Sequence, residues 1–457
     1  MALVITVLVA AIGVVIVRGD QIGMGVQSFS PNNTGSTHAI IRLTMDESIV
    51  ASSAIANYFT ITPGVRGTLS VTQNQIMFQP SEPLKQGQDY TVRVRAGIQG
   101  GAGRTLKHDV QWQFRVLPPL ILYMGPVDKI IQNLFVVDPS QPQNPRQLTN
   151  ASQGVVGYDV APDGTSVVYS EMQASGATPL KLLDTTTGES RLLYDCKDAS
   201  CTSPAWRPDG GAVAFERIDL NSGTGMAPGA PRVWVLDIAS GIATPLFKDN
   251  QQLGYSPHWS PDGSKLAVFN NNAGATNSPG GIVIHDFKAQ TDHTIQTVQG
   301  EVGDFSPDGK WMLFPKVVDQ GGGVFVTHRV LVDVSSGQYV QHDLLPDSDP
   351  ANDAESAWMP DSKHVIVARR PVSADSNAVA GTQLYSIDID SGEATPLVVD
   401  PAYSNGSAEV SPAGDTILFQ RYPFNQPGAR LQLWTYNLKT QELKQLADNA
   451  NYGRWLP

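Results

Sequence analysis

The chain has 457 residues, a formal net charge of -12 and only 16% charged residues, with 42 glycines and 32 prolines. Its negative charge and the lack of a Lys/Arg cluster in the sequence exclude binding to nucleic acid. The length exceeds that of one ordinary core, so two or three structural units are expected.

The N-terminal segment, residues 1–17, carries no charge and is rich in Ala, Leu, Ile and Val. As a helix it would be about 26 Å long, close to the roughly 30 Å hydrocarbon thickness of a bilayer. We predict a transmembrane signal anchor over residues 1–18. A cleaved signal peptide and a buried core helix are the alternatives.

Residues 26–117 follow as a compact β domain. Alternating apolar residues, a hairpin around Thr72-Gln73-Asn74 and a closing strand at Trp112 support this interpretation. Tyr90 enters a strand just after the corner at Gly87. We expect the Tyr90 ring to be buried and its hydroxyl to bond to backbone upstream, as at the corner of a sandwich.

The order of short motifs in this segment resembles the bacterial Ig-like domain found in surface-layer and other extracellular proteins. The motifs are Ser30-Pro31, Phe78-Gln79-Pro80, Pro83-Leu84 and Trp112-Gln113-Phe114. The resemblance implies a β-sandwich that serves as a spacer or adhesion module and has no catalytic residues.

A repeated unit begins after Pro118-Pro119. Each copy contains a Pro, usually followed by Asp-Gly, and then an apolar run; the prolines are Pro162, Pro208, Pro261, Pro307, Pro360 and Pro412. Their spacings of 46, 53, 46, 53 and 52 residues are typical of propeller blades with four strands each. We interpret the Asp-Gly pairs as turn residues, with calcium binding as the alternative.

The two ends of the repeat region make up one further unit. Residues 120–148 supply three strands without a first one, and Trp455 stands two residues before Pro457, as Trp259 does before Pro261. We therefore predict that the C-terminal strand pairs with residues 120–148 and leaves no open edge. The predicted fold is all-β, with an Ig-like sandwich and a seven-bladed propeller over residues 119–457; six or eight blades are the alternatives.

The repeats resemble the TolB-like family of β-propellers, also described as WD-type repeats. The resemblance rests on Trp206-Arg207-Pro208-Asp209-Gly210 and on its counterparts beginning at Trp259, Phe305 and Trp358. It implies a propeller that binds partner proteins. The blade count, the preceding Ig-like domain and the membrane segment depart from TolB, so TolB's own partners are not carried over.

Cys196 and Cys201 are the only two cysteines. We predict that they form a disulfide, which is stable only outside a reducing cytoplasm; two free thiols are the alternative. With an anchor at residues 1–17, this predicts a membrane-anchored protein whose other domains are extracytoplasmic, either periplasmic or on the cell surface.

Comparison of the repeats separates fold from site. Two residues before each Pro lies the packing position, which holds Val160, Trp206, Trp259, Phe305, Trp358, Val410 and Trp455. We expect these apolar side chains to pack between blades, with stacking on sugars as the alternative. One residue earlier lies the channel position, where charge varies: Asp159, Ala205, His258, Asp304, Ala357, Glu409 and Arg454.

The channel position is expected on the innermost strand of each blade. We predict that its charged members, Asp159, His258, Asp304, Glu409 and Arg454, form a specific binding mouth; water-exposed channel lining is the alternative. The sequence has no Gly-x-Ser-x-Gly and no His-Glu-x-x-His, so we assign no catalytic residue, metal or cofactor. The predicted function is a non-catalytic scaffold that binds other envelope proteins. The alternative is a propeller enzyme or lectin that acts on cell-envelope glycans.

Overall fold

A computed structural model of the chain describes residues 23–51, 53–223, 225–249, 252–270, 280–297, 300–370, 381–424 and 426–456. The chain divides into two compact units, with the division between Pro118 and Pro119. The predicted anchor over residues 1–18 lies outside the described residues. In the described part, no helix is long and apolar enough to cross a membrane.

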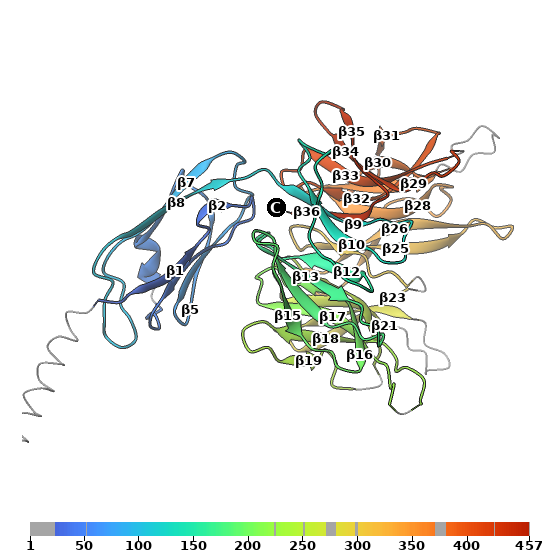
Figure 1. Ribbon diagram of the computed structural model, residues 1–457. Helices are drawn as coiled ribbons and strands as arrows, with labels where there is room; N and C mark the ends of the chain where they lie inside the picture. Colours follow the sequence, from blue (N-terminus) through green and yellow to red (C-terminus); the bar gives the residue numbers. More distant parts are fainter. Residues whose placement is uncertain are drawn as a thin grey trace, which may run out of the picture. The chain divides into compact units, whose positions relative to one another are not determined.

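The N-terminal unit is a pair of four-stranded sheets, drawn in blue to cyan in Figure 1. One sheet has the order β1-β3-β6-β5 and the other has the order β2-β8-β7-β4. The strands are β1 (Val26–Ser30), β2 (Asn33–Gly35), β3 (Ile41–Met45), β4 (Phe59–Thr62), β5 (Gly67–Thr72), β6 (Gln75–Pro80), β7 (Asp89–Val94) and β8 (Val110–Val116), with a 3-10 helix η1 (Ser53–Asn57) before β4. Residues from both sheets share one apolar core.

Strand β7 shows how the sequence builds this sandwich. Tyr90, Val92 and Val94 alternate with more exposed residues and are buried in the core. The Tyr90 ring stacks on Phe114 with ring centroids 5.6 Å apart. Its hydroxyl accepts a hydrogen bond from the backbone N–H of Lys85 at 3.1 Å, so the predicted tyrosine corner is confirmed.

The second unit contains, over its described residues, seven four-stranded antiparallel sheets, drawn in teal to red in Figure 1. In six of them the four strands are consecutive in the chain. The first two of these sheets consist of β12 (Val155–Val160), β13 (Ser166–Glu171), β14 (Leu180–Asp184) and β15 (Ser190–Tyr194), and of β16 (Ala199–Trp206), β17 (Ala212–Asp219), β18 (Arg232–Asp237) and β19 (Ala243–Pro245). The next two consist of β20 (Tyr255–Trp259), β21 (Lys265–Asn270), β22 (Gly281–Asp286) and β23 (Thr291–Gln296), and of β24 (Asp304–Phe305), β25 (Trp311–Asp319), β26 (Phe325–Asp333) and β27 (Gln341–Asp343). The last two consist of β28 (Asn352–Trp358), β29 (His364–Arg370), β30 (Gln383–Asp388) and β31 (Ala394–Val398), and of β32 (Tyr403–Val410), β33 (Thr416–Pro423), β34 (Gln432–Asn437) and β35 (Leu443–Asp448).

The remaining sheet joins the two ends of the unit. It has the order β11-β10-β9-β36 and consists of β9 (Leu120–Gly125), β10 (Asn133–Val137), β11 (Arg146–Gln147) and β36 (Asn451–Leu456). Strand β36 runs antiparallel to β9, with Trp455 opposite Ile121. This is the pairing that the sequence predicts, and it covers the edge of β9 that would otherwise be open.

The packing position lies between consecutive sheets, as predicted. Each of its seven residues is buried in, or packed against, a different apolar cluster. Three of its indoles also donate a hydrogen bond to a channel-position carbonyl of the preceding repeat: Trp259 to Ala205 at 3.1 Å, Trp358 to Asp304 at 3.1 Å and Trp455 to Glu409 at 3.3 Å. The position therefore serves the fold in every repeat.

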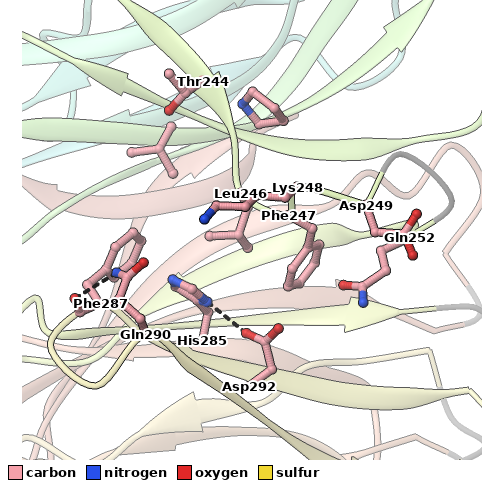
Figure 2. A pocket seen from close by; sticks show the side chains of 12 residues that line it. Thr244, Leu246, Phe247, Lys248, Asp249, Gln252, His285, Phe287, Gln290 and Asp292 are labelled. Atoms are coloured by element: carbon pink, nitrogen blue, oxygen red, sulfur yellow. Dashed lines mark hydrogen bonds and ion pairs between the residues drawn. The ribbon is translucent and has the colours of Figure 1, made fainter.

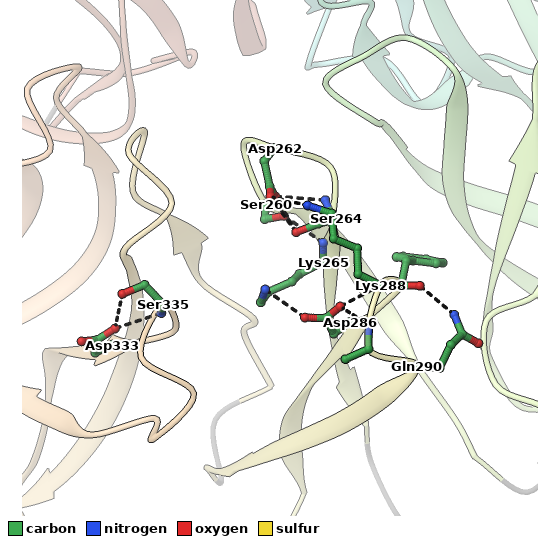
Figure 3. Close-up of polar contacts among 11 residues, drawn as sticks. Ser260, Asp262, Ser264, Lys265, Asp286, Lys288, Gln290, Asp333 and Ser335 are labelled. Carbon is green, nitrogen blue, oxygen red and sulfur yellow. Dashed lines mark hydrogen bonds and ion pairs between the residues drawn. The ribbon is translucent and has the colours of Figure 1, made fainter. Parts of the chain in front are cut away.

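The Asp of the Pro-Asp-Gly motif closes a turn. Asp262 accepts hydrogen bonds from the hydroxyl of Ser260 at 2.7 Å and from the backbone N–H of Ser264 at 3.0 Å (Figure 3). Burial works to raise the pKa of Asp262, but these hydrogen bonds outweigh burial and lower it to about 2. Asp286, at the next turn of the same sheet, pairs with Lys265 at 3.0 Å. These carboxylates are occupied by turn contacts.

A disulfide joins Cys196 to Cys201, with their Cα atoms 6.3 Å apart. Both residues are fully buried in the cluster between the sheets that begin with β12 and β16. The predicted cysteine pair is therefore confirmed.

Candidate functional site

The channel position lies on what we call the first strand of each repeat, namely β12, β16, β20, β24, β28, β32 or β36. Several of these first strands carry an irregularity just before the channel position. The register of β16, β20, β32 and β36 against their neighbours shifts there, which marks a β-bulge. Two residues before the channel position, the backbone is left-handed at Ser203 (φ 50°), Ser256 (φ 52°), Ser407 (φ 46°) and Tyr452 (φ 47°). Non-glycine residues rarely adopt this conformation, and here it recurs together with the bulge in four repeats.

Five of the first strands line one cavity of about 630 Å³. The strands are β12, β16, β20, β24 and β36, and four of the predicted site residues, Asp159, His258, Asp304 and Arg454, are part of its wall. Glu409 is not part of this wall. Ala205, also at the channel position, lines the cavity with a small side chain.

His258 and Asp304 form a pair across two neighbouring sheets. The Nδ1 atom of His258 lies 2.8 Å from Oδ1 of Asp304, and the two side chains are 40% and 49% exposed, so water in the cavity reaches both. Burial works to lower the pKa of His258, but the hydrogen bond and the charge of Asp304 outweigh burial and raise it. Burial works to raise the pKa of Asp304, and the same partner outweighs burial and lowers it.

Arg454 lies among carboxylates that do not touch it. Its side chain is exposed in the cavity, and among the described residues no hydrogen bond or ion pair within 4 Å reaches it. The charges of Glu409 and Asp159 raise the pKa of the guanidinium, which stays charged. Arg454 therefore presents a charged fork whose donors have no protein acceptor in the described part of the chain.

Glu409 and Asp159 flank Arg454 on β32 and β12. The Oε1 atom of Glu409 accepts a long hydrogen bond of 3.4 Å from the backbone N–H of Trp455, whereas its Oε2 atom is buried without a partner among the described residues. Burial raises the pKa of Glu409 to about 7, against the opposing charge of Arg454. Burial likewise raises the pKa of Asp159, whose Oδ2 atom accepts from the backbone N–H of Trp206 at 2.7 Å.

Tyr158 is a site residue that sequence reasoning missed. It lines the cavity, and its hydroxyl donates to the backbone carbonyl of Leu122 at 3.1 Å and lies against that of Tyr452. Burial raises the pKa of the Tyr158 phenol well above its usual value. Its position precedes the channel position by one residue, so extending the comparison of repeats by one position would have found it.

A second cavity, of about 460 Å³, was also missed by sequence reasoning (Figure 2). It lies between the sheets that begin with β16 and β20, and its wall includes Leu246, Phe247 and Phe287. Within it, Nδ1 of His285 lies 2.7 Å from Oδ1 of Asp292. The signal was present, because the residue before the turn Asp or Asn is apolar or aromatic in the other repeats: Val137, Leu183, Leu236, Val332, Ile387 and Tyr436.

Over the described residues, no group of three His, Cys, Asp or Glu side chains is placed to hold a metal ion. Asp159 and Glu409 each accept from the backbone N–H of the tryptophan at the packing position of the next repeat, whereas Asp304 pairs with an imidazole. The site can therefore donate and accept hydrogen bonds and offers charges of both signs.

Comparison with known proteins gives one family match. Residues 20–116 match the bacterial Ig-like domain family. The resemblance stated from the motifs of that segment is therefore confirmed. No curated protein sequence matches the chain.

Solved structures similar to this chain include TolB proteins and a peptidase. A putative TolB from Agrobacterium tumefaciens is 17% identical, covers 61% of this chain and 97% of its own, and has a TM-score of 0.42. TolB from Acinetobacter baumannii is 16% identical, with coverages of 88% and 83% and a TM-score of 0.42. A Mycobacterium tuberculosis puromycin-hydrolyzing peptidase is 13% identical, with a TM-score of 0.50; the match covers 92% of this chain and 57% of the peptidase. At 13% identity, the likeness to the peptidase concerns the fold alone and carries no function.

Proposed function

We propose that this protein is a non-catalytic scaffold in which the cavity at the channel position binds a partner protein. The observation that carries the proposal is Arg454, a charged side chain that projects into the cavity with no direct protein partner in the described part of the chain. The fold alone does not require a guanidinium at the channel position, because Ala205 and Ala357 occupy this position in other repeats.

The proposal includes an architecture. The seven sheets are taken as seven blades of one propeller over residues 119–457, and the sandwich over residues 26–117 as an Ig-like stalk. Residues 1–18 are taken as a signal anchor that holds the protein in the membrane, with the other domains extracytoplasmic. The disulfide between Cys196 and Cys201 supports this compartment, because such bonds persist outside the reducing cytoplasm.

No nucleophile is placed against His258 in the described part of the chain. Activation of a nucleophile needs a hydroxyl or thiol within hydrogen-bond reach of the imidazole. Among the described residues, the hydrogen-bond partner of His258 is Asp304, and no hydroxyl bonds to its ring.

Site-specific photo-crosslinking in native envelopes tests the proposal. A crosslinking amino acid replaces Val156, which is 38% exposed at the cavity, or Leu192, which is 54% exposed on the outermost strand β15 and serves as the matched control. We expect a discrete protein adduct from position 156 and none from position 192.

Two outcomes would overturn the scaffold. One is the same adducts from both positions, because the cavity would then have no special role. The other is turnover of an envelope glycan that Asp304→Asn and Glu409→Gln abolish, which would establish the propeller enzyme.

A further inference from the structure

The carboxylates that line the cavity already have hydrogen-bond donors. Asp159 accepts from the backbone N–H of Trp206 at 2.7 Å, and Asp304 pairs with His258 at 2.8 Å. The positive groups are less occupied. Arg454 has no acceptor within reach in the described part of the chain, and His258 uses only its Nδ1 atom, which leaves Nε2 free to donate when the ring is charged. The wall therefore retains unused donors on Arg454 and His258, beside the second oxygens of Asp159 and Asp304.

We propose that Arg454, together with His258 in the wall of the same cavity, captures a carboxylate of the partner polypeptide. The planar fork of a guanidinium matches the two oxygens of a carboxylate, and such bidentate pairs are among the strongest hydrogen bonds in proteins. This inference rests on the proposed scaffold function and names the chemical group that the scaffold recognises.

Exposed side chains in the cavity wall suit contact with the polypeptide on either side of that carboxylate. Val156 is 38% exposed and Tyr452 is 62% exposed, and both line the cavity. Their side chains place apolar surface next to the charged residues of the cavity wall, as is common in binding pockets. A volume of about 630 Å³ accommodates the last few residues of a chain, or an acidic side chain with its neighbours.

The groups around Arg454 make this capture dependent on pH. They come from four other first strands: Tyr158 and Asp159 on β12, His258 on β20, Asp304 on β24 and Glu409 on β32. Beyond Asp304, Arg329 is paired with Glu301 at 2.8 Å. In mildly alkaline solution, three carboxylates surround one guanidinium, and their field opposes a further anion.

Acidification weakens this opposing field. The pKa of Glu409 is about 7, so this carboxylate becomes neutral as the pH falls through that value. The pKa of His258 is raised, so its ring gains a charge over the same change. The negative charge around Arg454 then decreases while the positive charge increases. Capture of a carboxylate should therefore take up protons and strengthen from about pH 8 to about pH 6.

The test uses the full-length protein in detergent and three pools of random octapeptides. The first pool lacks Asp and Glu and ends in a free carboxyl group, the second is the same pool amidated at its C-terminus, and the third is amidated but contains Glu. We expect the first pool to be retained about tenfold more than the second, because amidation removes a charge-assisted pair. Retention of the third pool distinguishes an acidic side chain from a chain end as the source of the carboxylate.

Variants of one residue make the test specific. Arg454→Met should abolish the preference for carboxylates, and Arg454→Lys should keep part of it, since Lys retains the charge without the fork. Arg191→Met, on the outermost strand β15, is the matched control and should change nothing. The lysine variant also serves as the reporter if the methionine variant fails to fold.

Several results would overturn the inference. They are equal retention of all three pools, no effect of either Arg454 variant, weaker retention at the lower pH as expected for a cationic ligand, or preferential retention of a uronic-acid oligosaccharide. Failure of the scaffold itself looks different. If the adduct from position 156 persists in Arg454→Met, the scaffold stands and the carboxylate inference falls. If position 156 yields no protein adduct, both fall.

Discussion

Two adjacent residues of each first strand meet opposite surroundings. Trp358, at the packing position, is 9% exposed, belongs to an apolar cluster and donates to the carbonyl of Asp304. The channel position one residue earlier faces a cavity in several repeats and holds anything from Ala357 to Arg454. Uniform positions thus serve the fold in every repeat, and variable ones are free to serve a particular ligand.

The largest expected effect comes from removing strand β36, which carries both kinds of position. A chain that ends before Asn451 loses the buried side chains of Trp455 and Leu456 and exposes the edge of β9. We expect a loss of at least about 5 kcal/mol, comparable to the whole stability of many domains, because two large buried side chains disappear together. Denaturant unfolding measures this loss, with a chain that ends at Leu456 as the control. Unchanged unfolding would contradict closure by this strand.

A matched pair of substitutions tests the contrast between the two positions directly. Trp358→Ala should cost about 3–5 kcal/mol, because it leaves a cavity in the cluster between two sheets. The neighbouring Ala357→Ser should change the free energy of unfolding by less than about 0.5 kcal/mol, as for a substitution away from packed features. Urea titrations of both variants decide the matter, and similar losses would remove the distinction between packing and channel positions.

The smallest expected effect separates two carboxylates at the same strand position. An acid whose folded pKa is raised contributes stability below its unfolded pKa and loses that contribution as the pH rises through the folded value. For Glu409, with a folded pKa of about 7 and an ordinary value of 4.5, the loss falls between these two values. Glu409→Gln should therefore be more stable than the wild type by about 1–3 kcal/mol near pH 8 and equal to it near pH 4.

Asp304 should behave in the opposite way, because its folded pKa is lowered. Its ionised form stabilises the fold above the unfolded pKa, and this contribution disappears as the pH falls through the folded value. Asp304→Asn should therefore be less stable than the wild type at neutral pH, with the difference shrinking in acid. Melting curves as a function of pH measure both variants. The same sign for both would refute the electrostatic contrast between them.

Much of the fold could be predicted from local sequence patterns. The Pro-Asp-Gly spacing marks the repeats, Gly87 and Tyr90 mark a sandwich corner, and the separation of Cys196 and Cys201 suits a small loop. Each of these signals depends on turn chemistry or on side-chain alternation within a few residues. Such signals keep their meaning whatever the rest of the chain does.

The site was predicted only as a list. Three features of the site depend on residues 45 to 295 positions apart in the chain. They are which channel-position residues share the cavity, the pairing of Asp304 with His258, and the place of Glu409 outside the cavity wall. The cavity beside His285 was missed because the comparison of repeats covered only positions next to the recurring Pro. His285 stands at a position that is apolar or aromatic in the other repeats, so a wider comparison would have singled it out.

The sequence by itself determined the repeat, its turns, the packing residues and the pairing of the last strand with the first repeat. Tertiary structure alone decided that Arg454 is left without a contacting acceptor and that burial moves the pKa of Glu409 to about 7. The physical reason is the distance along the chain over which each kind of interaction acts. Turns and alternation act over a few residues of chain, whereas the field and the solvation at Arg454 are set by side chains that only the assembled sheets bring together.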